Sequence, residues 1–173
     1  MLWFGTFSRT DSEVEMHIDD MWFTGDMKSV GRERLLKDLE DHIFEGGKIF
    51  VGCDSNVIGD NCTYAHTICL YNEEARRGGR YYVKTCKIKM KFSTPPQVRI
   101  MQEAQYAIEI AMELAQVFPS ETIEVHLDVN TRKGNLSQTL ADQLSGYAKS
   151  AGFACKMKPD SWAATGIADG HTR

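Results

Sequence analysis

Two aspartates in this sequence directly follow apolar segments, where a carboxylate is unusual. Asp54 comes after residues 49–53, IFVGC, and Asp128 comes after residues 123–127, IEVHL. Each segment has the length and composition of a buried strand, so each aspartate is expected at the end of one. A buried carboxylate is costly unless a cation or hydrogen-bond donors accompany it. Mg²⁺ prefers carboxylate ligands and also binds phosphate oxygens, and the pair therefore predicts a site for Mg²⁺ or Mn²⁺.

Two such ions, about 3.5–4 Å apart, can activate water and stabilise the leaving oxygen when a phosphodiester is hydrolysed. The two aspartates also have a purely structural interpretation. Asp54 could cap a turn after its strand, and Asp128 together with Asn130 is typical of a turn. The residues alone leave both interpretations open.

The elements that position these residues can be predicted from the spacing of apolar side chains. This spacing predicts helices over residues 29–45, 95–117, 136–152 and 160–169. Strands are predicted over residues 48–56, 62–72, 80–92, 121–130 and 153–158. Ser29 is the expected N-cap of the first helix.

This order predicts an α/β protein with a mixed five-stranded sheet. The first three strands are close in sequence, which favours an antiparallel meander, and the last two follow helices, as in parallel βαβ units. Helices should then cover both faces of the sheet. We divide the chain into an N-terminal extension with one helix, residues 1–47, and a main domain, residues 48–173.

The ordered series of elements resembles the ribonuclease H-like superfamily, and within it the YkuK-type bacterial family of predicted ribonuclease H-like nucleases. The resemblance covers residues 48–171. Members of the superfamily carry an aspartate in the first strand, a glutamate early in the long helix and an aspartate in the fourth strand. The resemblance thus implies that Asp54, Glu103 and Asp128 are metal ligands and catalytic residues.

The last helix of that fold supplies a fourth acidic residue, and two candidates compete for this role. Asp160 stands at the start of the predicted helix, just after Pro159, where it could also serve only as an N-cap. Asp169 stands near the end of the same helix. His171, two residues after Asp169, could complete a small catalytic or metal-binding corner.

One basic segment stands out in an acidic protein whose net charge is −4. Residues 76–102 contain eight of the 20 basic residues and none of the 24 acidic ones, which leaves 12 basic and 24 acidic residues elsewhere. Such asymmetry is typical of a phosphate-binding surface, although lysines also keep an edge strand soluble. The predicted contacts to a nucleic-acid backbone are Arg76, Arg77, Arg80, Lys87, Lys89 and Lys91.

The remaining features exclude some classes of protein. The five cysteines form no C-x-x-C pair, which favours buried free thiols over a zinc site or a disulfide framework. His126, within a predicted strand, is expected to be structural. No apolar run approaches the ~20 residues that span a bilayer, so no membrane partner is expected. The N-terminus is a poor signal peptide, and a cytoplasmic protein is expected.

Together these features predict a Mg²⁺- or Mn²⁺-dependent nuclease that cleaves RNA or an RNA–DNA hybrid by a two-metal mechanism. The alternative is a ribonuclease H-like module that binds nucleic acid or protein without cutting, because a fold alone does not imply activity. The two hypotheses differ in whether the acidic side chains converge on one site.

Overall fold

The computed structural model describes residues 17–74, 77–91, 93–130 and 136–172. The chain begins with a short hairpin and a helix: β1 (Trp22–Thr24), β2 (Ser29–Val30) and α1 (Arg32–Phe44). Three long strands follow: β3 (Lys48–Ile58), β4 (Asn61–Asn72) and β5 (Arg77–Lys89). The second half contains α2 (Pro96–Val117), β6 (Ile123–Asn130), α3 (Leu136–Ser150), β7 (Ala154–Lys158), the π-helical segment η1 (Ala163–Ala168) and the 3₁₀ turn η2 (Asp169–His171).

The strands form one mixed sheet in the order β2-β1-β5-β4-β3-β6-β7. Strands β3, β4 and β5 are antiparallel neighbours, whereas β6 runs parallel to both β3 and β7. The predicted α/β fold with a mixed sheet is therefore confirmed, with seven strands in place of five. The additional strands β1 and β2 have only three and two residues, too few to show a period. Ser29 lies in β2, so its prediction as a helix cap is wrong, and α1 begins after Gly31.

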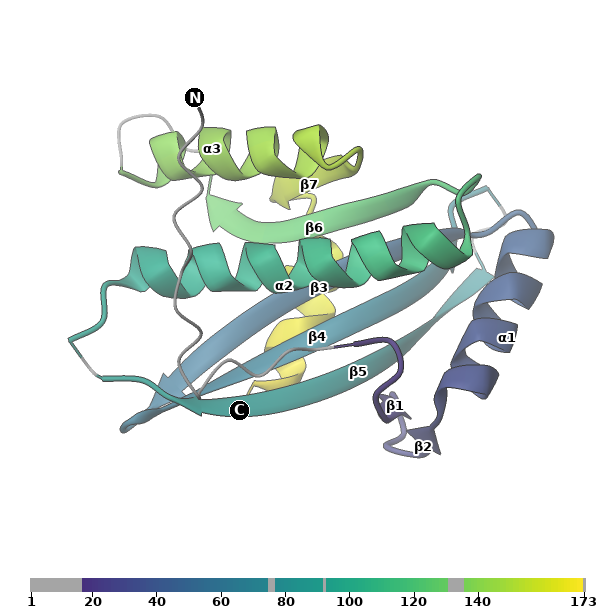
Figure 1. Ribbon diagram of the computed structural model, residues 1–173, viewed down its shortest axis with the longest axis horizontal. Helices are drawn as coiled ribbons and strands as arrows, with labels where there is room; N and C mark the ends of the chain where they lie inside the picture. Colours follow the sequence, from purple (N-terminus) through teal and green to yellow (C-terminus); the bar gives the residue numbers. More distant parts are fainter. Residues whose placement is uncertain (1–16, 75–76, 92, 131–135, 173) are drawn as a thin grey trace, which may run out of the picture.

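Helices cover both faces of the sheet, as predicted. Figure 1 shows α2 and α3 in front of the strands and the C-terminal segment, in yellow, behind them. Successive side chains of β3 point to opposite faces of the sheet. Val51 and Cys53 belong to the large core under α2, whereas Phe50 packs with Ala163 of η1 on the other face. Leu35 of α1 belongs to the large core as well.

The C-terminal segment lies directly on the backbone of β3. A Cβ added to Gly52 would be 2.7 Å from the carbonyl carbon of Ala163 and from the amide nitrogen of Ala164. His126 of β6 also binds this segment, because its Nδ1 accepts a hydrogen bond of 3.1 Å from the Ala163 amide. Its Nε2 lies 2.8 Å from Glu124 Oε1. This completely buried histidine is therefore structural, and burial lowers its pKa.

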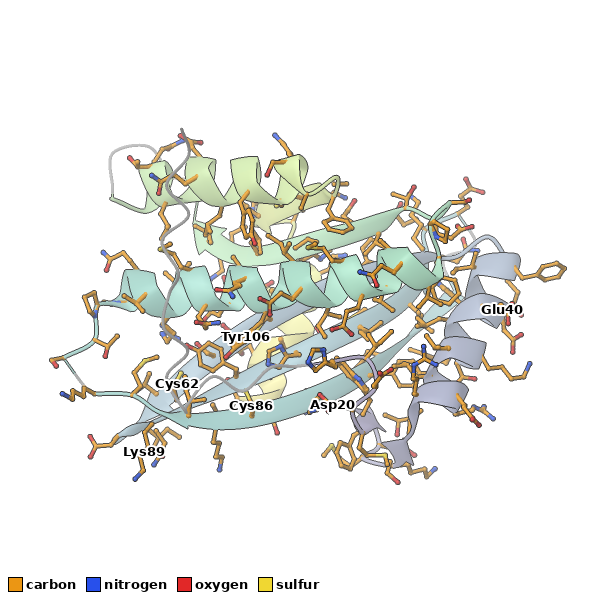
Figure 2. All side chains as sticks on the ribbon, viewed as in Figure 1. Asp20, Glu40, Cys62, Cys86, Lys89 and Tyr106 are labelled. Carbon is orange, nitrogen blue, oxygen red and sulfur yellow. The ribbon has the colours of Figure 1, made fainter. Side chains whose placement is uncertain are left out.

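The cysteines in the described residues are free, as expected. Cys53, Cys62 and Cys69 are buried, and Figure 2 shows Cys62 and Cys86 beside Tyr106 of α2, between this helix and the sheet. In the described part of the chain, no helix has the length and apolarity that crossing a membrane requires.

The contact at Gly52 predicts a large effect for a small substitution. Gly52→Ala should lower the free energy of unfolding by about 1–3 kcal/mol, because the new methyl group meets backbone that cannot move aside. Gly146→Ala in α3 is the matched control. It meets no atom within 4 Å and should stabilise the helix by about 0.5–1 kcal/mol. Urea unfolding of both variants checks this, and equal stability of the two would contradict it.

Candidate functional site

Asp54 and Asp128 occupy equivalent places on neighbouring parallel strands. The β3–β6 ladder runs from the pair Ile49–Ile123 to the pair Cys53–Leu127, and each aspartate is the next residue of its strand. Neither of them ends its strand, because β3 continues to Ile58 and β6 to Asn130. The predicted end of β6 at residue 130 is confirmed, whereas β3 extends two residues beyond its predicted end at residue 56. Both aspartates lie directly after the last paired residues of β3 and β6.

Glu103 of α2 points toward the same place on β3. Its side chain is buried, and the hydroxyl of Ser55 donates a hydrogen bond of 2.5 Å to its Oε1. Arg99, one helical turn earlier, has Nη1 3.6 Å from the same oxygen. That guanidinium also donates to the backbone carbonyl of Ser55 and, at 3.1 Å, to its hydroxyl. Glu103 is thus held against β3, one residue away from Asp54.

Burial, together with neighbouring acidic residues, raises the pKa of two of these carboxyl groups. Burial raises the pKa of Asp54 to about 6, and the charges of Asp128 and Asp169 add to this increase. Burial likewise raises the pKa of Glu103 to about 8, again with contributions from Asp54 and Asp128, although Ser55 and Arg99 act in the opposite direction. These four carboxyl groups, from β3, α2, β6 and η2, form what we call the acidic cluster.

The two candidates for the fourth acid, Asp160 and Asp169, lie in different surroundings. Asp169 follows η1, and its charge is one of those that raise the pKa of Asp54. Asp160 lies in the turn after β7, where it is exposed, and its amide donates to the carbonyl of Met157. The main charges that act on Asp54 and Glu103 do not include that of Asp160.

His171 contacts a different part of the sheet. Its Nε2 lies 3.1 Å from the hydroxyl of Tyr81 on β5. Tyr81 pairs with Cys69, which pairs with Phe50, and Phe50 precedes Asp54 by four residues. Because a strand rises about 3.3 Å per residue, the backbone row of Tyr81 is about 13 Å from that of Asp54. The predicted corner with Asp169 is therefore not evident in these contacts.

Lys158 is a member of the site that sequence reasoning did not identify. Its Nζ lies 2.5 Å from Asp128 Oδ1. Ser55 and Arg99 were missed as well, although the spacing of four residues between Arg99 and Glu103 on one helix is a recognisable signal. The sequence gives no comparable signal for Lys158. It lies in a strand, and which residue of β6 it faces depends on the register between β6 and β7.

Part of the basic segment lies at the same end of the sheet as the acidic cluster. Lys87 pairs with Thr63, and Thr63 pairs with Asn56, two residues beyond Asp54. Side chains of every second residue share a face, so Lys87 and the exposed Lys89 are on the face of Asp54. Figure 2 shows Lys89 at this end of β5, pointing away from the sheet.

A hollow of about 350 Å³ extends this basic region to α2. Lys91, Asn56 and Arg99 are among its lining residues. Arg99 therefore borders both the hollow and the acidic cluster, since it also contacts Glu103. The hollow thus has two cationic side chains in its lining, those of Lys91 and Arg99.

The other predicted backbone contacts are not part of this region. Arg80 pairs with Leu70 at the other end of β5. There the pKa of Asp38 on α1 is lowered, against the effect of burial, by a hydrogen bond of 2.7 Å from the Tyr82 hydroxyl and by Arg34, with a smaller contribution from Arg80. Arg76 lies outside the described residues, and Arg77 is described only by its backbone pairing with Asn72. The basic segment is thus divided between the two ends of β5.

The donor atoms of the acidic cluster suit a hard cation, since they are carboxylate oxygens with a hydroxyl nearby. Within residues 17–74, 77–91, 93–130 and 136–172, however, no three His, Cys, Asp or Glu side chains are grouped closely enough to hold a metal ion. Asp128 is paired with Lys158, and Glu103 with Ser55. The oxygen ligands of the site suit Mg²⁺ or Mn²⁺. In this structure, however, Asp128 and Glu103 contact positively charged side chains of the protein, Lys158 and Arg99.

Comparison with known proteins gives one match. A protein-family model described as Ribonuclease H-like matches residues 32–173, which includes α1 and every element after it. Neither the curated proteins nor the solved structures contain a match.

The acidic cluster predicts a gain in stability from removing one charge. The raised pKa of Asp54 means that the folded protein binds more protons than the unfolded chain between about pH 4 and 6, so stability falls as the pH rises through this window. Asp54→Asn removes this loss. In EDTA it should stabilise the protein on the order of 1–3 kcal/mol at pH 8 and have little effect at pH 4.

Urea unfolding at both pH values provides the measurement. Asp41→Asn, at an exposed carboxylate 3.5 Å from Lys37, should change stability by less than about 0.5 kcal/mol at either pH. A strong loss of stability in Asp54→Asn at pH 8 would show that the Asp54 carboxylate has a structural role instead.

Proposed function

The chain belongs to the ribonuclease H-like family, and we propose that it is a metal-dependent nuclease that hydrolyses phosphodiester bonds in RNA or in an RNA–DNA hybrid. Membership of this family supports a function related to nucleic acid. The observation that carries the more specific proposal is the acidic cluster, in which Asp54, Glu103, Asp128 and Asp169 come from four separate elements yet act on one another electrostatically. Carboxyl groups with raised pKa values are typical of functional sites.

Asp54, Glu103, Asp128 and Asp169 are the residues that would hold Mg²⁺ or Mn²⁺, as one ion or two. Such ions, when bound, lower the pKa of water and polarise the phosphate. Ser55 and Arg99 then have a positioning role, because their contacts with Glu103 fix the direction of its carboxylate. A ligand held in one orientation loses less entropy when it binds.

The basic residues at the same end of the sheet support a polyanionic substrate. Lys87 and Lys89 lie on the face of Asp54, and Lys91 and Arg99 line the hollow beside α2. A strand that crosses this end would contact cations on both sides of the carboxylates. Contacts of this kind position the backbone without reading its sequence.

One observation favours the alternative, a module that binds nucleic acid without cleaving it. Asp128 and Glu103 already have cationic partners within the protein, Lys158 and Arg99. A non-catalytic relative would have no need to release them. The two functions differ in one observable: a nuclease cleaves the nucleic acid when divalent cations are present, whereas a binding module leaves it intact.

A cleavage assay distinguishes these functions. End-labelled single-stranded RNA, single-stranded DNA and an RNA–DNA hybrid are incubated with Mg²⁺, Mn²⁺ or EDTA, and products are resolved on gels. We expect cleavage of RNA or hybrid only with a divalent cation. Asp54→Asn, Asp128→Asn and Asp169→Asn should reduce the rate by about a hundredfold or more. Asp160→Asn, the matched control, should stay within about twofold.

Two outcomes would contradict the proposal. Binding of nucleic acid without cleavage, under every metal condition, would establish the non-catalytic module. Cleavage that persists in EDTA and in Asp54→Asn would show that the acidic cluster is not the active site.

The basic region predicts a defined salt dependence. Each neutralised phosphate releases counterions, so the slope of log affinity against log salt concentration measures the number of contacts. Changing Lys87, Lys89 and Lys91 together to Gln should flatten this slope on a duplex by about two to three units. Fluorescence anisotropy over a salt series measures the effect.

The control changes three lysines elsewhere, Lys28, Lys37 and Lys149, and should leave the slope unchanged within about half a unit. Light scattering of the same samples tests the other role of the lysines. An unchanged slope together with stronger scattering would mean that Lys87, Lys89 and Lys91 only protect the edge of β5 from pairing with another molecule.

A further inference from the structure

Lys158, the last residue of β7, brings an ammonium group into the acidic cluster. Its Nζ is 2.5 Å from Asp128 Oδ1. That oxygen is buried and has no hydrogen-bond partner in the described chain, so the ion pair is what balances its charge. The side chain of Asp128 is 17% exposed, whereas that of Lys158 is 46% exposed. The pair therefore joins a confined anion to a cation that remains in contact with solvent.

The register of β6 and β7 creates this pair. Leu127 is opposite Met157, but the next pair joins Asn130 to Lys158, so two residues of β6 are left between these two pairs. One of the two is Asp128. The irregularity brings its carboxylate beside the end of β7, where the side chain of Lys158 can reach it. The contact thus results from backbone geometry and not from a chance meeting of two long surface side chains.

The two cations of the acidic cluster are held in different ways. Arg99 is fixed by the carbonyl and the hydroxyl of Ser55 in addition to Glu103. Lys158 has its one ion pair with Asp128 among the residues that the structure describes, and its side chain is half-exposed. An ion pair with a solvent-exposed partner contributes little net free energy. Lys158 can therefore return to solvent once another cation neutralises Asp128, whereas Arg99 would also lose its two contacts with Ser55.

We propose that Lys158 is a displaceable counter-ion of the candidate metal site, which holds Asp128 in the metal-free protein and competes with a divalent cation for it. This inference rests on the proposed function, because it concerns the same carboxylates. An ammonium 2.5 Å from Asp128 Oδ1 occupies space that a divalent cation, which needs a distance of about 2.1 Å, would also need. Lys158 thus lowers the affinity for metal and keeps Asp128 neutralised when metal is scarce.

Calorimetric titration of the full chain with Mn²⁺ tests the proposal. Lys158→Gln removes the competitor and should bind Mn²⁺ about three- to tenfold more tightly than the wild type. Lys156→Gln is the matched control, because Lys156 is on the same strand and face, is 45% exposed and pairs with Glu124. It removes the same charge about 7 Å away and should stay within about twofold of the wild type. Lys158→Arg keeps the charge and should also resemble the wild type.

Each result has one meaning. If the wild type binds Mn²⁺ and Lys158→Gln binds it no more tightly, the inference is wrong and the proposed function is unaffected. If Lys156→Gln tightens binding as much as Lys158→Gln, the effect is one of general charge and the inference is again wrong. If neither the wild type nor any variant binds Mn²⁺, the inference fails together with the metal requirement of the proposed function. Thermal melts in EDTA confirm that each variant is folded.

Discussion

In the described chain, strand β3 is paired on both edges as far as Cys53 and on one edge, with β4, as far as Ile58. The place where the pairing with β6 stops determines where the acidic side chains lie. Asp54 and Asp128 lie just beyond it, and Glu103 of α2 faces it with Ser55 as the intermediary. The long hairpin of β3 and β4 keeps Asp54 inside a rigid strand, so the carboxylate is held by paired backbone and not by a loop. Rigid elements position reactive groups more accurately than loops do.

Crowding four carboxyl groups at this place costs free energy, which the protein limits in two ways. Arg99 and Lys158 supply positive charge, and the raised pKa values of Asp54 and Glu103 mean that protonation removes part of the negative charge. The two cations differ in their surroundings, because Arg99 has three contacts within the protein whereas the side chain of Lys158 is half in solvent.

Much of this arrangement could be predicted from the sequence. The apolar runs before Asp54 and Asp128 indicated buried strands, and the order of strands and helices indicated a mixed sheet, because burial and short connections leave few alternatives. The contact between Lys158 and Asp128 could not be predicted, since it depends on an irregular register between β6 and β7. The different surroundings of Asp160 and Asp169 also depend on three-dimensional structure. A helix was predicted to begin at residue 160, but a turn occupies that position and the helical segment begins only after Ser161.

The place of Asp169 in the chain has a consequence for the order in which the site assembles. All seven strands and the helices α1, α2 and α3 precede residue 159, whereas Asp169 comes after them, on a segment that rests on Gly52 and His126. A ribosome adds about 5–20 residues per second, and folding follows synthesis from the N-terminus. The sheet can therefore form while the acidic cluster still lacks its fourth member. A nascent chain that has folded its sheet would therefore lack Asp169, one of the four acidic residues, until this last segment docks.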